Sequence, residues 1–234
     1  VAEAEKEIQN PERARLVAEV VQEVEIYEKG FAEVVGYVQN RNRLVNDVLN
    51  VQGPFMENTL TEILESAYAD YDSIASHYAA LAMKHLLLAR LYMAKFLDNN
   101  DQSAVDRVYE EFSKMQEQLD TLERELQNPG RRNQLGQVQE AKDKYASTFT
   151  QLVDEIFKRN EIREQTLDVI GPHVADLVEE VKLSVMADQD ELGPRLQAMN
   201  HTALVAIGII ACLAVVFGIG MSWYIIRSVL RQLG

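Results

Sequence analysis

A long run without a single charged side chain lies near the end of the chain, from Thr202 to Ile226. As an α-helix this run would be roughly 37 Å long, enough to cross a hydrocarbon core of roughly 30 Å with some tilt. A signal peptide would lie at the N-terminus, and a buried core helix of this length would normally carry a polar face. The run therefore predicts a transmembrane helix.

Aromatic and basic residues at the end of the run predict its orientation. Trp223 and Tyr224 belong to the type that prefers the headgroup zone, and Arg227 and Arg231 follow them directly. Basic residues at the end of a membrane helix favour the cytoplasmic side. This orientation divides the chain into an outer domain, a membrane helix and the start of a cytoplasmic segment, at residues 1–201, 202–226 and 227–234.

The outer domain is acidic and has no cysteine. The chain has 23 basic and 37 acidic residues, a net charge of −14, and beyond His201 its only charged residues are two arginines. Nucleic acid and anionic lipid would repel such a surface, so we expect no nucleic-acid partner. Because Cys212 lies in the membrane run, the outer domain forms no internal disulfide. These features favour a periplasmic domain held in the bacterial inner membrane, with a first membrane helix expected before Val1.

Helical periodicity without the alternation of a β-strand predicts an all-α outer domain. Gly53-Pro54 and Gly171-Pro172 read as the end of one helix and the first turn of the next, and two polar breaks lie at Asn99–Asp101 and Asn128–Gly130. The expected helices are 11–52, 54–98, 103–127, 131–170 and one from 172 into the membrane, kinked at Gly193-Pro194. An antiparallel bundle with both ends at one membrane needs an even number of helices, so a sixth is expected around Val1–Gln9.

An internal repeat underlies these helices. Residues 27–72 align without a gap with residues 145–190, and the identities include both Gly-Pro pairs and the dipeptides Arg41-Asn42 and Arg159-Asn160. The alignment predicts two related helical modules in one domain.

Arginines interrupt the apolar seams of the two aligned helices. Arg41 lies on the line of the first long helix that also holds Val24 and Phe31, and Arg159, Arg163 and Thr166 lie on the corresponding line of the repeat. A guanidinium inside a bundle needs an anion, and its planar fork suits a carboxylate. We therefore expect a small organic-acid site at Arg159, Arg163 and Thr166, with a related site at Arg41. The alternative is that these arginines pair with acids of neighbouring helices, such as Asp154 or Glu155.

The sequence contains no motif that indicates an enzyme. His77, His85 and His201 have no metal-ligand spacing and are expected to be satisfied or exposed side chains. No phosphate-binding loop, dinucleotide fingerprint, nucleophile elbow or zinc motif is present. We expect no catalytic residue, metal or cofactor.

The combined motifs resemble a known family. LNVQGP at 49–54, LDVIGP at 167–172 and DQDELGP at 188–194, in an acidic duplicated helical domain, resemble the helical bimodular sensor domain of bacterial methyl-accepting chemotaxis proteins and some sensor kinases. The tail from Ile225 to Gly234 resembles the start of a HAMP linker. The resemblance implies two stacked four-helix bundles, a homodimer, and a periplasmic site for small organic acids built from arginines and a threonine of facing helices.

Under this resemblance Arg163 and Thr166 match the C-terminal side of the family site, and Arg13 is a possible N-terminal counterpart. The expected function is the sensor region of a chemoreceptor, which transmits a helix displacement to cytoplasmic signalling domains of the same chain beyond Gly234. One alternative is the sensor of a histidine kinase or another transmembrane signalling protein. The other is a helical partner-binding domain without a small ligand.

Overall fold

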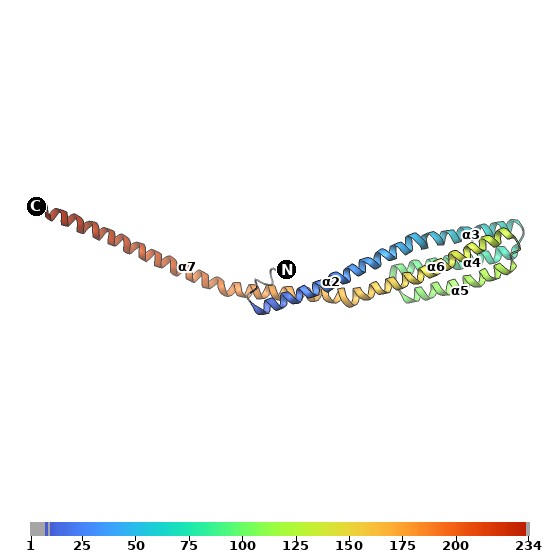
Figure 1. Cartoon of the computed structure of the whole chain (residues 1–234), viewed down its shortest axis with the longest axis horizontal. Helices are drawn as coiled ribbons and strands as arrows, with labels where there is room; N and C mark the ends of the chain where they lie inside the picture. The colour runs from blue at the N-terminus through green and yellow to red at the C-terminus, as the bar shows by residue number, and fades with distance from the viewer. Residues whose placement is uncertain (1–7, 9, 233–234) are drawn as a thin grey trace. The chain divides into compact units, whose positions relative to one another are not determined.

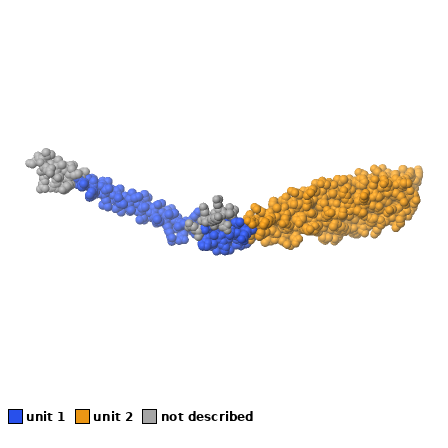
Figure 2. All heavy atoms as spheres, viewed as in Figure 1, with its two compact units in different colours: residues 1–22, 173–234 blue, residues 23–172 orange. Residues whose placement is uncertain are grey.

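The computed structural model describes residue 8 and residues 10–232, with side-chain surroundings up to residue 221. The described residues form helices and contain no strand, which confirms the all-α prediction (Figure 1). The elements in chain order are α2 (Pro11–Arg43), η1 (Leu44–Leu49), α3 (Asn50–Ala69), α4 (Ser73–Asn99), α5 (Gln102–Glu125), α6 (Pro129–Ile162), η2 (Arg163–Leu167) and α7 (Asp168–Gln232). They divide into two units, residues 1–22 with 173–234 as unit 1 and residues 23–172 as unit 2 (Figure 2).

Unit 2 contains a bundle of four helices, α3 to α6, packed around one apolar core (Figure 1). Phe96 on α4 packs edge-on against Phe149 on α6, with ring centroids 5.9 Å apart. Full burial of each large apolar side chain contributes roughly 1.5–3 kcal/mol. The largest fully buried core side chains of the bundle are Leu49, Met56, Leu60, Ile63, Leu86, Phe96, Met115, Leu119, Leu122, Tyr145 and Phe149.

The two helix connections at one end of the bundle are held together by a buried arginine. Arg131, at the start of α6, donates to the carbonyl of Ser66 at 2.8 Å and pairs with Asp70 and Asp72 in the α3–α4 turn. The Asp72 carboxylate also accepts from the Ala75 N–H at 3.0 Å and so caps α4. This turn was not predicted from the sequence, whereas the breaks predicted around Asn100 and Pro129 are both confirmed.

The helix ends predicted at the two Gly-Pro pairs are wrong, because the chain stays helical through both. Pro54 lies inside α3, and Pro172 lies inside α7. A π-helical segment precedes each proline: η1 ends five residues before Pro54, and η2 ends five residues before Pro172. In an ordinary α-helix the proline ring would clash with the carbonyl four residues earlier. The π-helical turn is wider than an α-helical turn and so leaves room for the ring.

The aligned segments of the repeat share this geometry in detail. The N–H of Asn50 donates to the carbonyl of Val45, and the N–H of Asp168 donates to that of Arg163, five residues back in both cases. Asn50 and Asp168 also have nearly the same backbone, with ψ of −10° and −15°. The aligned ends then differ, since α3 stops before Asp70 while α7 continues through Asp188. The described residues thus contain one four-helix bundle and do not show a second, stacked one.

Unit 1 contains the start of α2 and most of α7. Arg13 on α2 forms an ion pair with Asp188 on α7, and Leu16 and Leu177 are buried. The sixth helix expected around Val1–Gln9 lies almost wholly outside the described residues, and so do the side chains of Arg227 and Arg231.

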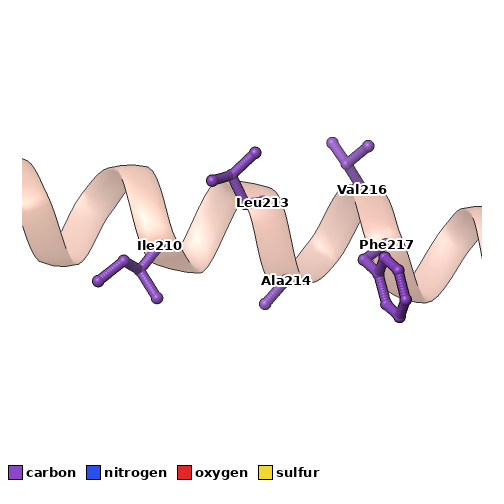
Figure 3. A pocket seen from close by; sticks show the side chains of 5 residues that line it. All are labelled: Ile210, Leu213, Ala214, Val216 and Phe217. Atoms are coloured by element: carbon purple, nitrogen blue, oxygen red, sulfur yellow. The ribbon is translucent and has the colours of Figure 1, made fainter.

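Among the described helices, one is long and apolar enough to cross a membrane, and its apolar part is the run in α7. Its best window has a mean hydropathy of 2.8 and no buried residue. Figure 3 shows the run from close by: Ile210, Ala214 and Phe217 point to one side of the helix, and Leu213 and Val216 point to the other. An apolar surface all round the helix is consistent with a membrane span. The continuation of this helix through Gly193-Pro194 is confirmed.

Candidate functional site

The candidate site lies where α2 runs beside the end of α6 and η2, within unit 2. A glycine allows the close approach: a Cβ on Gly30 would lie 3.3 Å from both Thr166 and Leu167. Further along, the Asn40 amide donates to the Glu155 carboxylate at 3.4 Å. The two aligned helices of the repeat therefore run side by side over this stretch.

Arg159 lies between the other arginines of the site, and its hydrogen-bond partners among the described residues are neutral. Its guanidinium donates to the side-chain oxygen of Asn100 at 2.9 Å and to that of Asn160 at 2.7 Å. The Asn160 amide donates in turn to Asn100 at 3.2 Å, which fixes both oxygens toward the arginine. Asn100 comes from the connection after α4, so the site draws on the edge of the bundle as well as on α6.

Two further arginines act on Arg159 electrostatically. Burial lowers the pKa of Arg159, and the neighbouring charges of Arg41 and Arg163 lower it further. Among the described residues, no carboxylate forms an ion pair with Arg41 or Arg159. Arg41 donates to Asn42 at 3.1 Å, while its buried Nε atom has no hydrogen-bond partner in the part of the chain described.

Arg163 is the more exposed member of this cluster. It pairs with Glu164 at 3.1 Å and with Asp168 at 3.6 Å, and about half of its side chain is accessible. Exposed pairs of this kind are weak, roughly 0–1 kcal/mol, so the guanidinium is free to exchange partners. We call Arg41, Arg159 and Arg163 the arginine cluster.

The other two predicted site residues have different surroundings. Thr166 is half-buried, and its methyl group is the part that faces Gly30 of α2. Arg13 lies in unit 1 and is already paired with Asp188. The structure thus brings together Arg41, Arg159 and Arg163, and it gives Arg13 a carboxylate within the chain.

The acids that the sequence offered as alternative partners are engaged elsewhere. Asp154 pairs with Lys158 one turn along α6 at 2.7 Å, and Glu155 accepts from Asn40. Arg41 and Arg163 thus both lie near enough to Arg159 to act on its charge, and within the described chain neither Arg41 nor Arg159 has a carboxylate counter-charge. Such an arrangement favours a bound anion, because an anion relieves the mutual repulsion and supplies the missing acceptors.

The asparagines of the site were missed by sequence reasoning. A signal for them existed in the repeat, since Arg41-Asn42 and Arg159-Asn160 are aligned identical pairs and each arginine donates to the asparagine that follows it. Asn100 carried no such signal, because only the folded chain brings the α4–α5 connection to α6.

A comparison with protein-family models and with curated proteins found no match to the chain.

Proposed function

We propose that the chain is the sensor region of a transmembrane receptor and binds a small organic acid at the arginine cluster. The observation that carries the proposal is that Arg41 and Arg159 lie close together without a carboxylate partner in the described chain. On a chain with a net charge of −14, unpaired arginines at a helix–helix contact are costly unless something outside the chain compensates them. A carboxylate supplies that compensation through charge-assisted, bidentate hydrogen bonds.

The position of the cluster suggests how binding is transmitted. Arg41 lies on α2, whereas Arg159 and Arg163 lie on α6 and η2, so an anion held by all three bridges the two helices. The ligand favours the arrangement of these helices that it binds more tightly, by no more than its difference in affinity. Since α7 follows η2 without a break and contains the apolar run, a displacement of η2 is passed along the same helix.

The receptor class rests on the resemblance of the Gly-Pro motifs and the C-terminal tail to chemoreceptor sensor domains. In this proposal residues 1–201 are periplasmic, the chain spans the bacterial inner membrane and forms a homodimer, and chemotaxis signalling domains follow Gly234. A histidine kinase output would leave the chemistry of the arginine cluster unchanged.

The proposal is tested by titration calorimetry of the full chain in detergent against a panel of mono-, di- and tricarboxylic acids. At least one acid is expected to bind, and Arg159→Gln is expected to weaken that binding by roughly 10- to 100-fold, because it removes a charge-assisted hydrogen bond worth roughly 1.5–3 kcal/mol. Arg41→Gln acts in the same direction.

Lys158→Gln is the matched control. It removes a positive charge from the neighbouring position of α6, but Lys158 is exposed and paired with Asp154, so the affinity is expected to stay within about twofold. If no acid binds, or if Arg159→Gln and Lys158→Gln have equal effects, the arginine cluster is only a structural feature and the helical partner-binding function takes its place.

A further inference from the structure

The turn between α3 and α4 exposes two aromatic rings at the end of the bundle. Tyr68, in the last turn of α3, is 79% exposed, and Tyr71, in the turn itself, is 94% exposed. Neither ring contributes to the apolar core, which ends at Ala67 and Ala75 on either side of the turn. Packing therefore gives no reason for aromatic residues at these two positions.

The backbone of Tyr71 makes its identity more unusual. The N–H of Asp72 donates to the carbonyl of Ala67 at 2.8 Å and that of Tyr71 donates to Tyr68 at 3.1 Å, which is the pattern of a Schellman helix end. Tyr71 has the left-handed φ of 60° that this pattern demands. Glycine normally fills that position, because a Cβ there crowds the following carbonyl.

The end of α4 provides an internal comparison. Asn100 has almost the same φ, 59°, and asparagine is the usual non-glycine residue in this conformation. The chain thus ends one helix with a suitable residue and the other with a strained, exposed tyrosine. Strain of this kind is concentrated at binding sites.

The two tyrosines form part of a pocket. It has a volume of about 380 Å³ and is lined by Tyr68, Tyr71, Ser73, Ser76 and His77. The volume lies within the range of roughly 300–1,000 Å³ that is usual for small-molecule sites. Neither a lysine nor an arginine lines this pocket.

The charges beside the pocket are mostly negative. Asp70 and Asp72 flank Tyr71 in the sequence, and Arg131 is shared between their two carboxylates. The side chain of Asp70 remains 62% exposed in spite of this ion pair. The local charge therefore attracts cations, as does the net charge of −14 for the whole chain.

We propose that this pocket binds a small organic cation of the quaternary ammonium class. The faces of aromatic rings attract such cations, and paired aromatic side chains are a recurrent means of holding them. The Ser73 hydroxyl can donate to or accept from a polar group attached to the cation, whereas the Ser76 hydroxyl already donates to the carbonyl of Asp72 at 2.9 Å and has only its oxygen left to accept. The site is separate from the arginine cluster in its residues and takes ligands of the opposite charge.

Choline and its neutral carbon isostere, in which carbon replaces the nitrogen, provide a matched pair of probes. Calorimetry of the full chain in a maltoside detergent is expected to show choline binding, and the isostere is expected to bind at least roughly fivefold more weakly because it lacks the charge that the rings attract. Equal binding of the two probes, or no heat from choline, overturns the proposal.

Tyr71→Gly separates binding from folding. The substitution relieves the left-handed strain, so the melting temperature is expected to stay the same or rise, while choline affinity falls at least roughly fivefold. Leu87→Ser, at an exposed position of α4 that belongs to neither site, is the control and is expected to leave choline affinity unchanged. Choline affinity that survives Tyr71→Gly contradicts the proposed site, whatever its effect on stability.

Discussion

At the residue scale, the bundle core contains a buried carboxylate whose partners were not evident in the sequence. Glu111 on α5 is fully buried, and its carboxylate lies 2.6 Å from Nδ1 of His85 on α4 and forms an ion pair with Arg107. A buried carboxylate is tolerated only with such partners, because its transfer from water is otherwise very unfavourable. His85 had been expected to be a satisfied or exposed histidine, and it is satisfied.

A double-mutant cycle on this pair tests its contribution to stability. His85→Leu leaves the carboxylate of Glu111 buried with one partner fewer and is expected to destabilise the bundle by about 2 kcal/mol. His85→Leu with Glu111→Leu removes both polar groups and is expected to recover most of that loss, because an apolar pair of similar volume is often as stable as a buried polar one. Thermal unfolding followed by circular dichroism gives the loss of stability of each single variant, His85→Leu and Glu111→Leu, and of the double variant. If the two single losses simply add up in the double variant, the two side chains are not directly coupled.

At the element scale, the sequence predicted the helices and the breaks around Asn100 and Pro129, but it mispredicted helix ends at the two Gly-Pro pairs and missed the α3–α4 turn. Gly-Pro pairs usually separate helices, and here a π-helical segment before each pair lets the helix continue. The real end of α3 was hidden because Tyr71, not glycine, holds the left-handed position. That Arg159 and Arg163 lie together was predictable, because both interrupt the apolar line of one helix. The sequence placed Arg41 at a second, related site, and this was wrong, because the structure brings Arg41 to Arg159. The contacts of Arg131, His85 and Asn100 were not predictable, because their partners come from segments distant in sequence.

A deletion in η1 tests the role of the π-helical segments. Removing the exposed Asp47 restores ordinary α-helical spacing and is expected to bring the carbonyl of Asn50 against the ring of Pro54, a clash worth roughly 3 kcal/mol. The deletion is therefore expected to lower the free energy of unfolding in the natural chain and in a Pro54→Ala variant. The loss is expected to be roughly 3 kcal/mol larger in the natural chain, because only that chain has the proline ring. The shift in register between α2 and α3 is common to both backgrounds and cancels. If the deletion lowers the free energy of unfolding equally in both backgrounds, η1 does not serve to accommodate Pro54.

At the scale of the whole molecule, the part of α2 in unit 2 leaves apolar side chains uncovered. Val24, Phe31 and Val35 are 37%, 53% and 38% exposed and recur at intervals of seven and four residues, which places them on one helix face. Val24 and Phe31 belong to the seam that the sequence predicted to be buried in a bundle or coiled coil. A regularly spaced, half-covered seam of this kind fits a second copy of the chain, in the homodimer that we propose.

Phe31→Ser is expected to weaken this homodimer. The ring occurs once in each copy of a symmetric interface, and loss of about 1.5 kcal/mol from each copy corresponds to a roughly hundredfold higher dissociation constant. Sedimentation equilibrium of the full chain in detergent measures this dissociation constant.

Leu87→Ser is the control for this prediction. It alters a similarly exposed side chain (45%) on α4 of the bundle and is expected to leave association unchanged. Because Phe31 is partly covered within the chain, both variants must also keep the helical content of the natural protein. A natural chain that is monomeric at every concentration, or equal effects of the two substitutions, would show that the exposed face of α2 is not where two copies meet.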